Sequence, residues 1–332
     1  MPRQAQRRLQ PRPGRQRGVA VVTALLLTTL AISIVASLFW QQQVQVRSME
    51  NQRLQLQTKW IQRGALDWAS VILRQPFGSR ISLEQIWATP LAETRLDQYI
   101  ERERIQGENF NASLSGQVYD ATARYNLNNL ASGGMRDPVQ TEVLARLLTN
   151  LRLEARLARP IADFVAAGQP LAVVDPEVTT GGTQTPRTGN PMPILRVDDL
   201  LAVQGVKPET VEALRPFVIV LPSQDTEVNV NTAPAEVLAA VLADCSVAQA
   251  NAMVEQRKRI PWNDVQLFKS EFECAQQQQP QGEAKINTSS NYFLVQSRIR
   301  LDRAALDAES LVERGGNLVN RGSINVIWTR QN

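Results

Sequence analysis

An arginine-rich start followed by a long uncharged stretch constrains this chain more than any other feature of its 332 residues. Residues 1–17 contain arginines but no acidic residue, and no charged residue lies between Gly18 and Val46. Within that stretch, residues 19–40 read VAVVTALLLTTLAISIVASLFW. As a helix this segment is about 33 Å long, enough to cross the hydrocarbon layer of a membrane. Because the arginines hold their end in the cytoplasm, we expect a single-pass protein whose remaining chain faces the other side.

Charge and composition exclude several classes of function. The formal net charge is +4, but six of the 36 basic residues precede Gly18, which leaves 30 against 32 acidic residues. The rest of the chain therefore has a net charge of −2 and no general attraction for a polyanion. The sequence has no histidine, which removes the commonest zinc ligand and the Ser-His triad. We expect a protein that is not an enzyme, because no GxSxG, HExxH, SxxK or P-loop pattern occurs.

The junction at Arg17-Gly18-Val19 resembles the type III signal of the type IV pilin family. That resemblance implies a prepilin peptidase that cuts after Gly18, so that Val19 becomes the methylated mature N-terminus and the apolar helix is retained. The other interpretation is an uncleaved signal anchor with an incidental glycine. Most pilins carry glutamate at the fifth mature position, where this chain has Thr23. A subunit with no neighbour above it does not need that carboxylate, and its absence within this family therefore points to the tip of the assembly.

The spanning helix is expected to continue beyond the membrane as a stalk. Leu54, Ile61, Ala65, Trp68 and Ile72 recur at helical spacing and form one apolar stripe. Two interpretations fit this stripe, packing against the protein's own domain or against a partner groove.

Downstream, a mostly helical block of residues 127–283 is bracketed by strand patterns. Asp137-Pro138 is a good helix start, with aspartate as the cap and proline at the first helical position. Residues 175–193 are rich in proline and glycine and are expected to form a long loop. Phe293, Val295, Ser297, Ile299 and Leu301 alternate with more polar residues as in a half-buried strand, and Ile324, Val326 and Trp328 repeat the pattern. These features predict an α+β fold with a helical insertion.

Three motifs in order resemble the K-type minor pseudopilin family of the type II (general) secretion pathway. They are YNLNNL at residues 125–130, VDDLLAVQGV at residues 197–206 and VNVNTA at residues 228–233. The resemblance covers essentially the whole chain. It implies a non-enzymatic subunit at the pseudopilus tip that assembles with I- and J-type minor pseudopilins, in protein export across the outer membrane. The anchor would lie in the inner membrane with the C-terminal domain in the periplasm, and further contacts would involve the outer-membrane channel and exoprotein cargo.

The resemblance also implies a division of the chain and a fold class. Residues 1–18 form a cytoplasmic leader, residues 19–40 the transmembrane helix and residues 41–75 its periplasmic extension. Residues 76–126 and 284–332 form a pilin-like antiparallel sheet, and residues 127–283 form the α-helical insert. That insert is expected to contain helix-hairpin-helix (SAM-like) elements.

The polar residues of the motifs are expected to have structural roles in helix caps and turns. Asn229, Asn231 and Thr232 precede a helix expected near Pro234, where their oxygens could cap free N–H groups. Three others, Asn126, Asn128 and Asn129, lie near a turn at Gly133-Gly134. Ligand binding is the alternative role.

Two cysteines occur, Cys245 and Cys274. In an oxidising compartment they could pair, which stabilises by about 3 kcal/mol in the chain-entropy account, or they could be two small buried residues. The resemblance also associates the family with calcium. No D-x-[DN]-x-[DN]-G run occurs, and the loose candidate ligands are Asp244 and Glu273.

Two other classes of function compete with this interpretation. Residues 197–214 and 228–241 are similar to helix-hairpin-helix repeats of DNA-uptake receptors, in which backbone N–H groups of a Gly-x-Gly hairpin bind phosphate. Here the hairpin at residues 243–249 has no glycine, and Pro208 follows Lys207 where the first hairpin would have its second glycine. We therefore expect no nucleic-acid binding. The third class is an anchored hydrolase, but no spacing singles out a pair of carboxylates.

Overall fold

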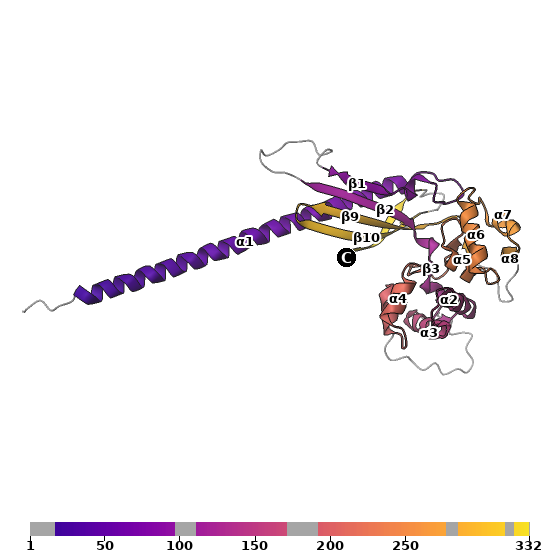
Figure 1. Cartoon of the computed structure of the whole chain (residues 1–332), viewed down its shortest axis with the longest axis horizontal. Coiled ribbons are helices and arrows are strands. Elements are labelled where there is room, and N and C mark those ends of the chain that lie inside the picture. Colours follow the sequence, from indigo (N-terminus) through magenta and orange to yellow (C-terminus); the bar gives the residue numbers. More distant parts are fainter. Residues whose placement is uncertain (1–16, 97–110, 171–191, 277–284, 316–321, 332) are drawn as a thin grey trace, which may run out of the picture. The chain divides into compact units, whose positions relative to one another are not determined.

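The computed structural model describes residues 17–96, 111–170, 192–276, 285–315 and 322–331 (Figure 1). The chain divides into two units, Met1–Gln57 and Thr58–Asn332, and helix α1 (Arg17–Leu73) runs from the first into the second. Most of the expected leader, most of the loop expected at residues 175–193 and most of the break at residues 276–279 lie outside the described residues.

The first unit consists of α1 in its described part. Among the described residues, one helix is long and apolar enough to cross a membrane, and it covers Val19–Leu73. Its apolar side chains between Val19 and Trp40 are all exposed. The hydroxyls of Thr28 and Ser33 donate to Leu25 O and Thr29 O within the helix, which satisfies them without a partner helix.

The second unit is built on a five-stranded antiparallel sheet with the order β1-β2-β9-β10-β11. The strands are β1 (Leu91–Arg95), β2 (Ala112–Asp120), β9 (Tyr292–Leu301), β10 (Ala304–Arg314) and β11 (Ile324–Gln331). Strands β2 and β9 are neighbours, and Asp120 pairs with Phe293 at the end of their ladder. The chain therefore leaves the sheet after β2 and returns to the same place before β9.

A helical region lies between those two strands in the sequence (Figure 1). Its helices are α2 (Pro138–Asn150), α3 (Ala158–Gly168), α4 (Pro208–Leu214), α5 (Ala235–Val241), α6 (Val247–Arg257), α7 (Val265–Glu271) and α8 (Glu273–Gln276), with 3-10 turns that include η4 (Leu127–Leu130) and η6 (Val197–Ala202). Three short strand pairs join its parts: β3 (Tyr125–Asn126) with β6 (Val218–Ile219), β4 (Ala131–Ser132) with β5 (Met135–Arg136), and β7 (Val228–Asn229) with β8 (Ile286–Asn287).

The expected start of α2 is confirmed. The Asp137 carboxylate accepts a hydrogen bond from Gln140 N, and Pro138 is the first helical residue. Val143, Leu144, Leu147 and Leu148 are buried in the core of the helical region.

Helix α1 packs on one face of the sheet through part of the expected stripe and through neighbouring positions. Its buried positions in the second unit are Thr58, Gln62, Ala65, Ala69 and Leu73, whereas Trp68 keeps 47% of its surface exposed. The expected stripe is confirmed in part, because Ala65 is buried and Ile61 and Ile72 pack against the core. The small side chains of Ala65 and Ala69 let the helix approach the strands closely. The contact itself is with the protein's own sheet, where Ala69 and Leu73 meet Val118, Phe293 and Val295.

The second face of the sheet is partly covered by the helical region. The alternation predicted for β9 is confirmed, since Phe293, Val295, Ser297, Ile299 and Leu301 are buried. Leu294, on the opposite face, is buried as well, because it packs with Leu311 and with Ile219 and Leu221 from the helical region. The face that alternation assigned to solvent is thus apolar where the helical region covers it.

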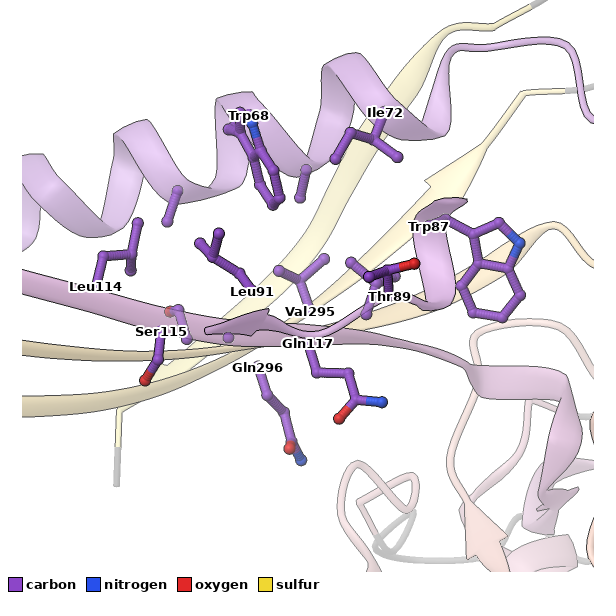
Figure 2. Close-up of a pocket in the computed structure, with 15 residues that line it drawn as sticks. Trp68, Ile72, Trp87, Thr89, Leu91, Leu114, Ser115, Gln117, Val295 and Gln296 are labelled. Carbon is purple, nitrogen blue, oxygen red and sulfur yellow. The ribbon is translucent and has the colours of Figure 1, made fainter. Parts of the chain in front are cut away.

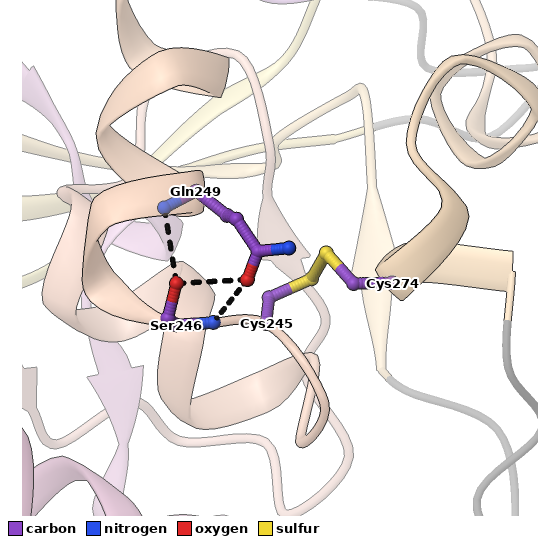
Figure 3. Close-up of a disulfide and its surroundings, with 4 residues drawn as sticks. All are labelled: Cys245, Ser246, Gln249 and Cys274. Carbon is purple, nitrogen blue, oxygen red and sulfur yellow. Dashed lines mark hydrogen bonds between the residues drawn. A yellow bond between two sulfur atoms is a disulfide. The ribbon is translucent and has the colours of Figure 1, made fainter.

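A disulfide joins Cys245 to Cys274, from the start of α6 to α8, across a sequence separation of 29 residues. Figure 3 shows Cys245 next to Ser246, which forms a reciprocal capping box with Gln249 at the first turn of α6. Cys245 is buried and Cys274 packs against the same apolar core, which also contains an aromatic cluster of Trp262, Phe268 and Phe272.

We predict that replacing both cysteines by alanine lowers the free energy of unfolding by about 3 to 4 kcal/mol, the chain-entropy value for a loop of this length. Urea unfolding of the full chain in a non-ionic detergent measures the loss as a lower midpoint. A reductant should destabilise the wild type to the same extent and leave the double variant unchanged. Equal midpoints with and without reductant would contradict the prediction.

Candidate functional site

The VNVNTA motif is attached to the end of β2 through one buried carboxylate. Asp120 Oδ2 accepts hydrogen bonds from Asn229 Nδ2 at 2.8 Å and from Thr232 Oγ1 at 2.7 Å. Asp120 Oδ1 accepts from Thr122 N, Thr122 Oγ1 and Ser290 Oγ at 2.6 to 2.9 Å. Only 4% of Asp120 is exposed. One carboxylate thus holds the motif, the end of β2 and the approach to β9 together.

The other half of the motif is bound to the chain that follows α6. Asn231 donates to Trp262 O and accepts from Trp262 N, each at 2.9 Å. The buried Arg257 guanidinium donates to the carbonyl oxygens of Val230 at 2.8 Å and of Ala233 at 2.5 Å. Burial lowers the pKa of Arg257 to about 10. Because this value is still well above neutral pH, the guanidinium stays protonated.

The expectation that these residues cap the next helix was wrong. Helix α5 has Pro234 at its N-cap and no side-chain hydrogen bond there. Asn229 Oδ1 instead accepts from Asn231 N within the motif. The donors and acceptors of the motif are used in bonds to sequence-distant parts of the chain, which outcompete the local caps.

The YNLNNL motif is bound to residues 221–226. Asn126 Oδ1 accepts from Leu221 N at 3.0 Å, and Asn126 Nδ2 donates to Ser223 O at 2.7 Å. Asn128 Nδ2 donates to Leu221 O, and Asn129 Nδ2 donates to Thr226 O, both at 2.7 Å. The expected local role is present at Asn126, whose Oδ1 also accepts from Asn128 N and caps η4. These three side chains thus clamp a segment that is remote in sequence, not the Gly133-Gly134 turn.

The described acids near the disulfide do not gather into a set of calcium ligands. Within the described ranges, no three or more of the side chains Asp, Glu, His and Cys gather as metal ligands would. Asp244 and Glu273 are exposed beside the disulfide. Calcium prefers six to eight oxygen ligands, several of them carboxylates, which two loose acids do not supply.

The two expected hairpins have different turns. Gly205, between η6 and α4, adopts a φ of +91°, which glycine tolerates without strain. Ala243, between α5 and α6, adopts a φ of +47° although it carries a Cβ. Asp244 follows it and is exposed.

An apolar crevice lies between α1 and the sheet, and Figure 2 shows Trp68 and Ile72 directed from the helix toward the strands. The crevice has a volume of about 20 Å³, which is close to the space of a single water molecule. Ser115, Gln117 and Gln296 point away from it in the same view. It is a packing feature and offers no room for a substrate.

The residues of the expected processing site lie in α1. Gly18 and Val19 are helical, and the Val19 side chain is exposed. Thr23 Oγ1 lies 3.0 Å from both Val19 O and Ala20 O, to which it can donate. The hydroxyl is therefore satisfied within its own helix.

Sequence reasoning missed Asp120, Arg257 and Trp262, which hold the VNVNTA motif. Asp120 ends an alternating strand, and Arg257 lies on a helix with a polar face. Neither position differs in the sequence from an ordinary exposed charge, so no signal in a single sequence identifies them.

Comparisons with known proteins agree with this architecture. The family models for the type II secretion system protein K match residues 123–223 and residues 228–293. The type II secretion system protein K of Pectobacterium carotovorum subsp. carotovorum is 24% identical over 92% of this chain and 94% of its own length. The protein of the same name from Klebsiella pneumoniae is 26% identical over 91% and 94%.

A solved structure has the same fold. A chain in the crystal structure of the GspK-GspI-GspJ complex from the enterotoxigenic Escherichia coli type 2 secretion system superposes with a TM-score of 0.61. The match covers 86% of this chain and 99% of that chain, at 21% sequence identity. Because the family models match both parts of the helical region and the relatives match nearly the whole length, the chain belongs to the type II secretion system protein K family.

Proposed function

We propose that this protein is a non-enzymatic minor pseudopilin at the tip of a type II secretion pseudopilus, where it assembles with I- and J-type minor pseudopilins and initiates or caps the structure in protein export. The observation that carries the proposal is the fold shared with a chain of the GspK-GspI-GspJ complex. The apolar part of α1 anchors the chain in the inner membrane, with the C-terminal unit in the periplasm.

The proposed processing follows from the N-terminal sequence. A prepilin peptidase cuts between Gly18 and Val19, removes the basic leader and leaves the apolar helix as an assembly element. Thr23 supports a position at the tip, because its hydroxyl bonds to Val19 O and Ala20 O in its own helix and offers no carboxylate to a subunit above.

The helical region is inserted in a pilin-like body, with residues 76–126 and 284–332 on either side of residues 127–283. The pairing of β2 with β9 supports this division, because it brings together strands that flank the whole helical region. A region of this size above the sheet leaves no place for a further subunit, which is the steric basis of a cap.

The asparagine motifs have a structural role in this proposal. Asn229, Asn231 and Thr232 bond to Asp120 and Trp262, and Asn126, Asn128 and Asn129 bond to residues 221–226. With their polar atoms committed inside the protein, they are not available to a ligand.

The hairpins are helix-hairpin-helix elements that have lost phosphate binding. The turn at Ala243 has no glycine to let a phosphate approach the backbone, and the exposed Asp244 beside it repels one. A DNA-uptake function therefore has no support in these turns.

We predict that the membrane-extracted protein begins at a methylated Val19 in cells that have prepilin peptidase and at its encoded N-terminus in cells that lack it. Mass analysis of the N-terminal peptide measures both. As a control, Gly18→Leu should block cleavage in the first strain without removing the protein from the membrane. An intact N-terminus in both strains would exclude the pilin mechanism.

We predict that Thr23→Val leaves secretion near the wild-type level, because the hydroxyl bonds to its own helix and valine has the same shape. Secretion is measured as the fraction of exoprotein outside cells whose own copy is deleted, with immunoblots for equal protein levels. A loss as severe as the deletion itself would mean that position 23 contacts a neighbouring subunit, which contradicts a place at the tip.

We predict that Asn229→Ala lowers the free energy of unfolding by about 1 to 3 kcal/mol, because it leaves the buried Asp120 carboxylate short of a donor. Urea unfolding of the full chain in a non-ionic detergent provides the measurement. The matched control is Asn325→Ala, at an exposed position of β11, which should change the midpoint little. Unchanged stability of Asn229→Ala would favour a ligand-binding role for the motif.

A further inference from the structure

A cavity rich in arginine lies between the second face of the sheet and the helical region. Its volume is about 310 Å³. The helical region contributes Arg124 and residues 195–198, 215–216 and 218–220. The sheet contributes Leu294, Gln296, Glu309, Trp328 and Arg330. Its charged lining consists of four arginines and two acids: Arg124, Arg196, Arg215, Arg330, Asp198 and Glu309. The cavity lining thus has a net positive charge, whereas the chain after Arg17 has a net charge of −2.

Two of these arginines are held in place by neighbours. Arg215 Nη2 lies 2.6 Å from Asp198 Oδ1 and 2.8 Å from Glu212 Oε1. Arg330 donates to Leu195 O at 2.7 Å, and its guanidinium carbon lies 3.8 Å from the centroid of the Trp328 ring. The planar group of Arg330 is therefore fixed against an aromatic face, with other N–H groups left for an acceptor.

Arg124 has no such partner. Burial lowers the pKa of this arginine from its ordinary value, and the nearby Glu309 acts in the opposite direction. Within the part of the chain that the structure describes, its guanidinium makes no hydrogen bond and no ion pair. Glu309 Oε1 accepts from Gln296 Nε2 at 3.0 Å. A partly buried guanidinium with unused donors is costly, and an entering anion removes that cost.

A polar groove on the same sheet face adjoins the cavity. The groove has a volume of about 460 Å³ and shares Gln296 and Glu309 with the cavity. Ser115, Gln117 and Arg298 form part of its lining, together with Asp307, which lies 2.8 Å from Arg298. A single small ion would fill only the arginine end, whereas an extended peptide can occupy both.

We propose that this cavity and groove bind an acidic peptide segment of another protein, whose carboxylates pair with Arg124 and Arg330 while its backbone lies along the open sheet face. Guanidinium and carboxylate are planar groups that match in two parallel hydrogen bonds. The inference goes beyond the proposed function, since neither the anchor nor a place at the tip requires this site.

The test uses the full chain in a non-ionic detergent at low salt, with a fluorescein-labelled peptide of alternating glutamate and serine. Fluorescence anisotropy measures binding, and a peptide with glutamine in place of glutamate is the neutral control. We expect Arg124→Gln and Arg330→Gln each to weaken binding of the acidic peptide about tenfold, the loss for one charged hydrogen bond. The exposed Arg156, paired with Glu154, gives the matched control Arg156→Gln, which should bind as the wild type does.

A variant that gains affinity separates the site from a folding effect. Glu309→Gln keeps an oxygen for the hydrogen bond from Gln296 and removes the negative charge beside Arg124, so it should bind the acidic peptide more tightly than the wild type. The arginines before Gly18 add the same background to every variant. The proposal is overturned if the glutamine peptide binds equally well or if the Arg124 and Arg330 variants bind as the wild type does. It is also overturned if inorganic phosphate binds at Arg124 while the acidic peptide does not.

Discussion

The buried carboxylate of Asp120 is the contact through which the helical region is fixed to the sheet. It accepts bonds from Asn229 and Thr232 of the helical region and from Ser290, which precedes β9. Asp120 pairs with Phe293 in the ladder, so the carboxylate lies where the chain leaves the sheet and where it returns. Five donors around one buried carboxylate compensate for its desolvation, and loss of a single donor would remove part of that compensation. The orientation of the insertion therefore depends on these short hydrogen bonds together with the apolar contact of Ile219 and Leu221 with the sheet.

The sheet has two faces that serve different purposes. One is covered by α1, where Ala65, Ala69 and Leu73 allow close approach and the core is filled by Phe293 and Val295. Among the described residues, the other is covered where Ile219 and Leu221 meet Leu294 and Leu311. Beyond that contact the face becomes polar, and the arginine cavity opens at the boundary. A helix that fills a face completely stabilises the fold, whereas an incomplete cover leaves room for recognition.

The sequence predicted the parts that depend on local chemistry. Three features were predicted because each follows from the spacing of a few residues. They are the cap at Asp137, the alternation of β9 and an apolar helix long enough to cross a membrane. Strand β10 was not foreseen, since Asp307, Glu309 and Glu313 interrupt the apolar pattern. Their carboxylates have partners on the neighbouring strand: Arg298 lies 2.8 Å from Asp307, Gln296 donates to Glu309 and Tyr292 donates to Glu313. Such pairing cannot be predicted until the strands are aligned.

The candidate site was predicted less well, for the same physical reason. The motifs were located correctly as segments, but their partners are remote: Asn229 is 109 residues from Asp120, and Asn126 is 97 residues from Ser223. Local capping is the natural expectation for asparagine before a helix, and it fails where a distant buried charge offers a stronger bond. The cavity was missed entirely, because its arginines come from four separate segments.

The turn at Ala243 shows how the helical region keeps a demanding backbone geometry without the residue that suits it. A left-handed conformation costs a residue with a Cβ about 1 to 2 kcal/mol relative to the right-handed one. Two neighbouring features oppose that cost: the disulfide at Cys245 removes freedom from the unfolded chain, and the capping box at Ser246 fixes the start of α6. A glycine would relieve the strain more simply, and would also let a phosphate approach the backbone. The turn is thus specified by covalent and capping constraints that hold two helices together, which is the requirement of a packed scaffold and not of an anion-binding hairpin.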